Sequence, residues 1–251
     1  MHKKGIYEIA ENIPIADKTY KMRLLGYTGD IKVPGQFINI ELPGYYLRRP
    51  ISICDWDEKG MDIIYKVVGD GTKLMSELDP GTKLDILTGL GNGFDTGALR
   101  SGGTAAVIGG GVGVPPLYGL AKRLIKNGIR VKAVLGFNEE SQIFYDKEFE
   151  ALGAEVVLTT ADGSRGLKGF VTDALKDMEL EYYYCCGPMP MLRAVHKALS
   201  LRGIDGELSF EARMGCGFGA CMGCSMETLK GTKRICKDGP VFKSTEVSFD
   251  E

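Results

Sequence analysis

The chain has 251 residues, of which 44% are hydrophobic and 25% charged, which is the composition of a globular protein with room for two compact domains. Its formal net charge of −2 and the lack of a basic stripe argue against nucleic-acid binding. The sequence has no apolar run long enough to span a membrane and no apolar secretory segment at its start. We therefore expect a cytoplasmic protein that binds neither membranes nor nucleic acids.

The first hundred residues are typical of short strands separated by turn residues. Pro-Gly and Asp-rich breakers interrupt six strand-like segments, at 6–13, 19–26, 36–41, 51–55, 61–68 and 83–87. A single helix-like stretch lies at 72–78. This pattern predicts an antiparallel β-barrel over residues 1–99.

Two motifs in the predicted barrel suggest a bound flavin nucleotide. The first contains Arg49 and Ser52; arginine offers a planar fork for phosphate, and the serine offers a hydroxyl to a flavin ring. The second, Gly69-Asp70-Gly71-Thr72, opens the short helix, whose free N–H groups can hold a pyrophosphate. The alternative for the arginines is ordinary solvated charge.

Strands and helices alternate after residue 100. Strands are predicted at 104–108, 131–135, 155–159 and 182–185, and helices at 117–127, 146–151, 170–177 and 190–201. This alternation predicts a doubly wound parallel sheet over residues 100–206, after which the regular pattern stops.

A glycine run at 109–113 lies between the first of these strands and its helix. Its backbone N–H groups and the helix start can face a pyrophosphate, with Gly110, Gly111 and Gly113 as candidate contacts. The run lacks the G-x-G-x-x-G fingerprint of dinucleotide-binding folds. The alternative interpretation is a tight strand–helix connection.

The preferred nucleotide can be argued from charge. Glu139 and Glu140 follow the second strand of this domain, where an acid can bind a ribose hydroxyl and an arginine would bind a 2′-phosphate. With no basic residue nearby, the sequence favours NAD over NADP, with Glu139 as the candidate contact. A solvated loop is the alternative.

The last strand of the domain leads into Cys186-Gly187-Pro188-Met189, at the sheet edge where open α/β folds bind ligands. All four residues are candidate NAD contacts. The Cys186 thiol is the candidate catalytic group beside a nicotinamide. Cys185 should point to the opposite face and fill the core, because side chains alternate along a strand.

Four cysteines near the C-terminus are the most informative feature. Cys216, Cys221, Cys224 and Cys236 follow the spacing C-x4-C-x2-C-x11-C, whose first part matches the plant-type [2Fe–2S] loop. Thiolates suit iron–sulfur clusters, and a tight loop is made possible by four glycines, Gly215, Gly217, Gly219 and Gly223. We predict that residues 207–251 form a small [2Fe–2S] module.

Two other uses of these cysteines are less consistent with the pattern. A structural zinc site usually shows two short pairs that lie well apart. A disulfide framework fits poorly with seven cysteines, an odd number, in a chain of this length. Cys54, Cys185 and Cys186 then remain as small buried hydrophobic residues.

Five motifs follow one another along the chain: R-P-I-S at 49–52, G-D-G-T at 69–72, G-G-G-V-G-V-P-P at 109–116, C-G-P-M at 186–189 and E-A-R-M-G-C-G-F-G-A-C-M-G-C at 211–224. In this order they resemble the ferredoxin–NADP reductase superfamily. Within it, the chain is similar over essentially its whole length to the electron-transfer subunits of class B dihydroorotate dehydrogenase. The cysteine module directly after the nucleotide domain is the specific part of this resemblance.

The resemblance implies three cofactors: FAD in the barrel, NAD on the sheet domain and one [2Fe–2S] cluster on the C-terminal module. The four C-terminal cysteines would be the cluster ligands. The implied FAD contacts lie on two strands and the short helix: Arg49, Pro50, Ile51, Ser52, Ile64, Tyr65, Lys66, Gly71 and Thr72.

The resemblance also implies a partner and a function in pyrimidine biosynthesis. The partner would be an FMN-containing catalytic subunit that oxidises dihydroorotate, in a heterotetramer of two copies of each chain. Electrons would pass from FMN to the cluster, then to FAD and finally to NAD.

Two alternatives remain open at this point. One is a free-standing NAD(P)H-dependent reductase that donates to a soluble acceptor. The other is a zinc-binding interaction module without redox activity. On the preferred interpretation, three cofactors use all of the chain and leave no region for a dihydroorotate site. We therefore expect an oxidoreductase component that cannot oxidise dihydroorotate alone.

Overall fold

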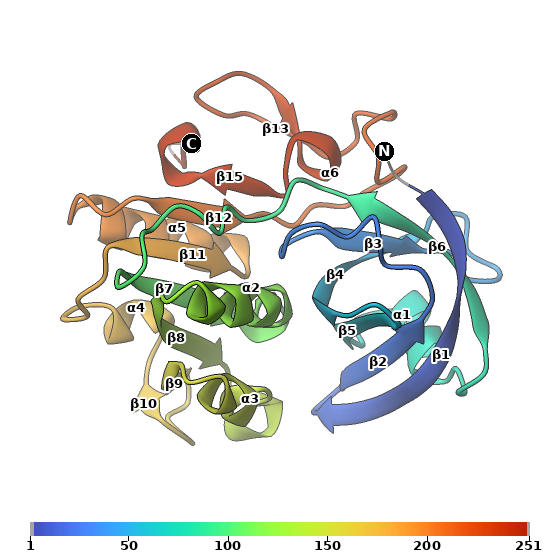
Figure 1. Cartoon of the computed structure of the whole chain (residues 1–251), viewed down its shortest axis with the longest axis horizontal. Helices are drawn as coiled ribbons and strands as arrows, with labels where there is room; N and C mark the ends of the chain where they lie inside the picture. The colour runs from blue at the N-terminus through green and yellow to red at the C-terminus, as the bar shows by residue number, and fades with distance from the viewer. Residues whose placement is uncertain (1–2, 250–251) are drawn as a thin grey trace.

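Six antiparallel strands close into a barrel in the N-terminal part of the chain (Figure 1). The computed structural model describes residues 3–249. The strands follow the order β1-β2-β5-β4-β3-β6 around the barrel, and a short helix, α1, follows β5. Their bounds are β1 (Lys3–Ala16), β2 (Thr19–Leu25), β3 (Phe37–Ile40), β4 (Arg49–Trp56), β5 (Gly60–Lys66), α1 (Asp70–Ser76) and β6 (Lys83–Leu90).

The second part of the chain forms a sheet of seven strands in the order β10-β9-β8-β7-β11-β12-β15. All neighbours pair in parallel except β12 and β15, which are antiparallel. The bounds are β7 (Thr104–Gly110), β8 (Arg130–Phe137), β9 (Glu155–Thr160), β10 (Leu167–Lys168), β11 (Tyr182–Cys186), β12 (Gly206–Ser209) and β15 (Val241–Lys243).

Helices cover both faces of this sheet, which makes it doubly wound as predicted. One face packs against α2 (Pro115–Lys126) and α3 (Asp146–Ala151), and the other against α4 (Val171–Ala174) and α5 (Met189–Ser200). The direction of the strand order reverses between β7 and β11, the position where such folds bind ligands. Among residues 3–249, no helix combines the length and hydropathy needed to cross a bilayer.

The structure corrects the prediction that the regular pattern stops at residue 207. Strands β12 and β15 both join the sheet, so the predicted boundary after residue 206 divides β12. Both strands are only three or four residues long, which leaves little periodicity to read in the sequence. The helix predicted at 170–177 is also shorter, and the two-residue strand β10 precedes it.

Between β12 and β15 the chain leaves the sheet and crosses to the barrel. This C-terminal segment contains a hairpin of β13 (Ser225–Met226) and β14 (Lys233–Arg234), followed by α6 (Ile235–Asp238). Figure 1 shows the segment, in orange to red, above both the barrel and the sheet. The C-terminal segment therefore contacts the other two parts of the molecule.

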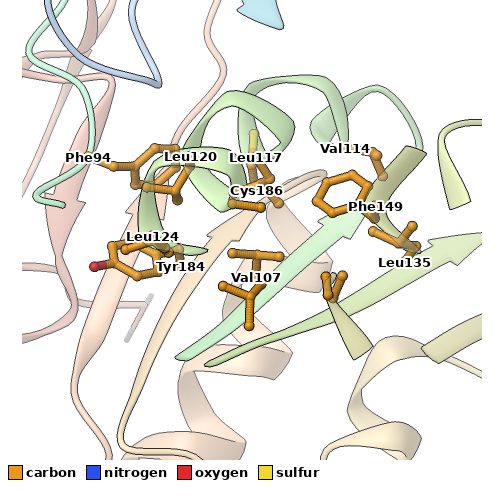
Figure 2. Close-up of a cluster of buried hydrophobic side chains, with 14 of the residues drawn as sticks. Phe94, Val107, Val114, Leu117, Leu120, Leu124, Leu135, Phe149, Tyr184 and Cys186 are labelled. Atoms are coloured by element: carbon orange, nitrogen blue, oxygen red, sulfur yellow. The ribbon is translucent and has the colours of Figure 1, made fainter. Parts of the chain in front are cut away.

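The barrel and the sheet share their hydrophobic cores. Cys54 and Ile64 of the barrel pack in one cluster with α2 and with Phe94 of the linker that follows β6. Figure 2 shows part of this cluster, with Phe94 beside Leu120 of α2. Polar contacts join the same surfaces: Lys122 pairs with Asp55 at 2.5 Å. The two domains are therefore packed as one body.

A buried carboxyl group holds the linker against the sheet. Glu207 of β12 is 4% exposed, and its Oε2 accepts a hydrogen bond of 2.9 Å from the Asp95 backbone N–H. The Tyr184 hydroxyl donates to the Asp95 carbonyl at 2.8 Å. Glu207 borders a surface cavity of about 480 Å³. Burial raises the pKa of Glu207 to about 7.

This raised pKa should make the stability of the protein depend on pH. Between about pH 4.5, the ordinary value for Glu, and pH 7, the native Glu207 keeps a proton that the unfolded chain releases, so stability falls as pH rises. The effect is at most about 3 kcal/mol. In Glu207→Gln this fall should be absent, measured as thermal unfolding midpoints of both proteins at pH 5 and pH 8. The same pH dependence in both proteins would contradict the assignment.

Candidate functional site

An arginine and a glycine form a cradle at the mouth of the barrel. A Cβ added at Gly71, in the first turn of α1, would lie 2.3 Å from the Nε of Arg49, so the glycine leaves room for the guanidinium in this position. The guanidinium also lies over the Tyr45 ring at 4.5 Å from its centroid and donates to the Leu47 carbonyl. A cation held beside a helix start is suited to a pyrophosphate. This geometry fits FAD.

The two neighbouring arginines have different surroundings. Arg48 makes ion pairs with Asp85, at 2.8 Å, and with Glu41, so its charge is already compensated. The sequence gives no sign of this difference, because both partners of Arg48 are brought together only by barrel closure. Thr72 also has a local role: its hydroxyl caps α1 by accepting from the Val68 and Gly69 N–H groups at 2.9 and 3.2 Å.

Alternation along β4 divides the predicted flavin residues between two faces. Ile51 packs toward the barrel interior. Ser52 and Pro50 pair across the sheet with Phe37 and Asn39 of β3, so these four side chains share the outer face. A flavin on this face would meet Ser52 and Pro50 directly.

The predicted residues of β5 are divided in the same way. Ile64 packs in the core shared with the sheet domain, and Lys66 lines a cavity between the two domains. The Tyr65 side chain instead lies inside the barrel, where its hydroxyl donates to Asn12 Oδ1 at 2.9 Å. A flavin contact of Tyr65 would therefore use its backbone.

The cavity between the domains has a volume of about 580 Å³ and lies at the carboxyl ends of the sheet strands. Several loops and Lys66 of the barrel surround it. The lining residues are Lys66, Gly110, Gly111, Val112, Gly136, Phe137, Asn138, Gln142, Thr159, Gly169, Phe170, Val171, Thr172, Pro188, Pro190, Met191, Ala194 and Glu211. Its size and position suit a pyridine nucleotide.

The three predicted glycines have different surroundings: open space at Gly111, a side chain at Gly110 and backbone at Gly113. Gly111 has φ +52° and open space where a side chain would be, so a ligand can approach its backbone. A Cβ at Gly110 would lie 2.4 Å from Met191 Sδ. A Cβ at Gly113 would lie 2.2 Å from the Cys186 carbonyl, and Gly113 is buried away from the cavity. Gly113 is needed for packing.

The structure does not place the Cys186 thiol at this cavity. Cys186 is 2% exposed and belongs to the core cluster beneath α2, as Figure 2 shows. Burial raises the pKa of this thiol to about 12. The catalytic contact predicted for Cys186 stays a prediction: in this structure Cys186, like Cys185 on the opposite face, is a core residue.

Three other predicted NAD residues are not among those that line the cavity. Glu139 accepts hydrogen bonds from its neighbours Ser141, at 2.7 Å, and Gln142, at 3.5 Å. Gly187 packs against the end of Met191, since a Cβ there would lie 2.6 Å from Met191 Cε. Met189 is 44% exposed at the start of α5. Pro188 does line the cavity.

Two polar residues of the cavity were not among the predicted NAD contacts. Thr159, at the end of β9, is fully buried and its hydroxyl has no hydrogen-bond partner among the described residues. Glu211 follows β12, and desolvation raises the pKa of its carboxyl group. Thr159 could have been predicted as a ligand contact, because it ends a predicted strand. Glu211 follows β12, a strand that the sequence did not predict, so its position at the cavity could not be foreseen.

The four predicted ligands come together in the C-terminal segment as two pairs. The Cys216 N–H donates to Cys221 Sγ, and the Cys236 N–H to Cys224 Sγ, both at 3.4 Å. The Ala220 N–H also donates to Cys216 Sγ at 3.2 Å. Backbone N–H groups aimed at sulfur favour thiolates, the form that binds iron.

The cysteines differ in exposure and acidity. Burial of the Cys216 thiol opposes ionisation, but hydrogen bonds from backbone N–H groups outweigh it and lower its pKa to about 6. Burial, together with the adjacent Cys224, raises the pKa of Cys236 to about 12. Cys221 is exposed, whereas Cys224 and Cys236 are buried. Cys216 is half-buried, so two of the four cysteines are at least partly accessible and Cys221 is the most exposed.

The loop glycines allow this arrangement in two ways. Gly217 and Gly219 have φ values of +78° and +92°, which other residues rarely adopt. Gly215 and Gly223 lie against Cys221 Sγ, where added Cβ atoms would be 3.1 and 3.6 Å away. Two of the four glycines thus provide the backbone conformation of the loop, and the other two leave space for the Cys221 sulfur.

Two pairs of thiols fit a cluster of two irons. A [2Fe–2S] cluster has four cysteine ligands divided between two irons, which the pairs Cys216/Cys221 and Cys224/Cys236 can supply. The residues present therefore fit this cofactor.

Comparison with protein families identifies two parts of the chain. Residues 211–248 match the iron–sulfur cluster binding domain of dihydroorotate dehydrogenase B. Residues 107–197 match the oxidoreductase NAD-binding domain.

Curated relatives match nearly the whole chain. The dihydroorotate dehydrogenase B (NAD(+)) electron transfer subunit of Fusobacterium nucleatum is 43% identical over 96% of this chain and 97% of that protein. The protein of the same name from a Geobacillus species is 41% identical over 98% of this chain and 99% of its own length.

Solved structures share the fold. An NADH-dependent reduced ferredoxin–NADP oxidoreductase, studied for flavin-based electron bifurcation, has a TM-score of 0.87 and 28% identity over 98% of this chain and 91% of its own. The FAD/NAD-binding domain of a nitric oxide dioxygenase from Vibrio cholerae has a TM-score of 0.69 and 20% identity, with coverage of 82% and 99%. The predicted oxidoreductase with [2Fe–2S], FAD and NAD is confirmed.

Arg49→Ala should weaken FAD binding by about 10- to 100-fold, because a phosphate loses a charged hydrogen-bond partner. Arg48→Ala is the matched control, since Arg48 is paired with acidic residues instead. The flavin content of both purified variants, measured by absorbance after dialysis, provides the test. Full flavin occupancy in Arg49→Ala would contradict the cradle.

Cys221→Ser should remove the cluster while NADH still reduces FAD, because a serine oxygen is a poor ligand for iron–sulfur clusters. Iron and acid-labile sulfide should fall to background, and the rate of flavin bleaching by NADH should stay within about twofold of wild type. Cys54→Ala, a change in the core, is the control that should keep its iron. Equal loss of both activities would argue against separate sites.

Proposed function

The chain belongs to the family of electron transfer subunits of dihydroorotate dehydrogenase B, and we propose that it carries electrons from a dihydroorotate-oxidising partner to NAD. In this proposal the electrons reach the cluster first, then FAD, and finally NAD. The function belongs to pyrimidine biosynthesis. The observation that carries it is the position of the barrel face of β4 between the nucleotide cavity and the cysteine loop.

This order of cofactors follows from their chemistry. NAD takes two electrons as a hydride, an iron–sulfur cluster passes one at a time, and a flavin supplies both kinds of transfer when bound. The flavin therefore belongs between the other two. Here Lys66 lines the nucleotide cavity from the barrel, and Asn39, beside Pro50 on the outer barrel face, contacts the cysteine loop.

The residues of this chain would bind and orient the cofactors. We assign the pyrophosphate of FAD to Arg49 and the start of α1, and its ring system to the Pro50–Ser52 face. The nucleotide would lie along Gly110, Gly111 and Pro188, with the unpaired Thr159 hydroxyl as an additional partner. Four cysteine sulfurs would hold the cluster.

We propose NAD as the preferred nucleotide. Glu139 and Glu140 follow β8, and the next basic residue along the sequence is Lys147, a pattern that disfavours a 2′-phosphate. The names of the relatives from Fusobacterium and Geobacillus include NAD(+), which supports this preference.

We further propose that the partner is an FMN-containing catalytic subunit, in a complex of two copies of each chain, in the cytoplasm. The exposed face of the cysteine loop is the expected docking surface. Cys221 is exposed there, and the apolar side chains of Phe218 and Met222 beside it are 40% and 53% exposed. Free thiols suited to iron are typical of a reducing compartment.

A free-standing reductase is the second candidate. Its support is the likeness, at a TM-score of 0.87 over 98% of the chain, to an oxidoreductase whose name links NADH, ferredoxin and NADP. Such an enzyme would need no catalytic subunit to turn over.

Co-expression with a candidate catalytic subunit separates the two functions. We expect the two chains to co-purify and the complex to reduce NAD with dihydroorotate, whereas this chain alone shows no dihydroorotate oxidation. The chain alone should still reduce an artificial dye with NADH, which shows that it is intact. Rapid NADH-dependent reduction of a soluble ferredoxin by the isolated chain, without complex formation, would favour the second candidate.

A further inference from the structure

We propose that Asn39 is a positioning residue that holds the cysteine loop against the flavin face of the barrel. The proposal rests on the function above, and it assigns to this side chain the control of the flavin–cluster geometry. The two faces of β3 have different neighbours. Ile38 and Ile40 point into the barrel, whereas Phe37 packs in the cluster that includes Cys224 and Cys236.

Asn39 lies on this outer face and contacts the loop directly. It is 1% exposed, and its Nδ2 donates to the Cys216 carbonyl at 3.2 Å. The next residue, Gly217, has φ +78°, and a Cβ there would lie 2.4 Å from Asn39 Nδ2. The loop can therefore approach the amide only because residue 217 is glycine.

The partners of β3 place this contact next to the flavin site. Asn39 pairs with Pro50 and Phe37 with Ser52 in the antiparallel ladder. Paired residues lie on the same face, and neighbouring strands are about 4.8 Å apart. The carbonyl of the first cluster ligand is thus held one strand away from the residues assigned to the flavin ring.

The amide is costly to bury, which argues for a specific role. Asn39 Oδ1 is buried and has no hydrogen-bond partner among the described residues. A buried and unsatisfied acceptor destabilises a protein, and a leucine of similar size would avoid that penalty. The hydrogen bond from Asn39 Nδ2 to the Cys216 carbonyl is the interaction that offsets this cost.

A second asparagine fixes the other end of the cysteine module. Asn92, two residues after β6, donates from Nδ2 to the carbonyls of Asp238 at 3.1 Å and Val241 at 2.7 Å. Its Oδ1 accepts from the Val241 N–H at 3.1 Å. These bonds anchor the residues that follow Cys236, so the barrel side of the molecule holds the module at both ends.

The test compares Asn39→Leu and Asn39→Asp with wild type, each purified anaerobically with FAD and cluster. Leucine removes the donor, whereas aspartate keeps the planar shape and removes the donor when its carboxyl group is ionised. Asn127→Leu, an exposed residue at the end of α2, is the matched control. Gly217→Ala perturbs the same contact from the loop side.

Two measurements report on the contact. Amide hydrogen exchange of residues 215–224 in the loaded protein should be about fivefold faster in both Asn39 variants, the factor expected for one net hydrogen bond. After rapid mixing with NADH, flavin reduction should keep its wild-type rate, while the following cluster reduction slows by a similar factor. Gly217→Ala should behave like the Asn39 variants, and Asn127→Leu like wild type.

Unchanged loop exchange and cluster reduction in Asn39→Asp and Gly217→Ala would overturn the proposal. So would faster exchange spread over the whole of β3, since that indicates a general structural role. If Asn39→Leu does not fold, the other two variants decide. A wild-type protein without iron or labile sulfide would instead disprove the proposed function, so the two failures are distinguishable.

Discussion

The arrangement of this molecule depends on hydrophobic cores that cross domain boundaries. Phe37 and Leu90 of the barrel lie in the same cluster as Phe210, Phe242 and the buried cysteines of the C-terminal segment. On the other face of the sheet, barrel residues share a cluster with α2. Because close-packed interiors resist deformation, the barrel, sheet and cysteine loop cannot shift independently without opening a core.

This constraint has a consequence for electron transfer. Cofactors held by three separate, mobile domains would exchange electrons only in particular orientations. Here the C-terminal segment leaves the sheet after β12, contacts the outer face of β3 and returns as β15. The chain thus packs the cysteine loop, the outer face of β3 and β4 and the cavity between the domains into one body. The protein supplies the placement, and the cofactors supply the redox chemistry.

The exposed part of the cysteine loop is the exception to this burial. Cys224 and Cys236 lie in the core, whereas Cys221 and the adjacent Met222 face solvent. One side of the site is therefore insulated and the other is accessible. Such an asymmetry suits a group that receives electrons from outside and passes them inward.

Much of this could be predicted from local sequence patterns. The six barrel strands, the alternating strands and helices and the glycine run depend on periodicity and turn residues, which act over short distances. The cysteine spacing is equally local, and all four cysteines do come together. The two short strands β12 and β15 were not predicted, because they have too few residues to show a periodic pattern. Their place in the sheet depends on pairing with strands from other parts of the sequence.

The sequence by itself thus determined the fold class and the cofactor set and identified four cysteines as candidate cluster ligands, since these follow from residue type and spacing. Only the tertiary structure decided which of two adjacent arginines is free for a phosphate and on which side of the sheet the Cys186 thiol is buried. It also decided that Thr159, Glu211 and Asn39 lie at the sites. The physical reason is that a side chain's surroundings come from residues distant in sequence, which meet only when the barrel closes and the sheet forms.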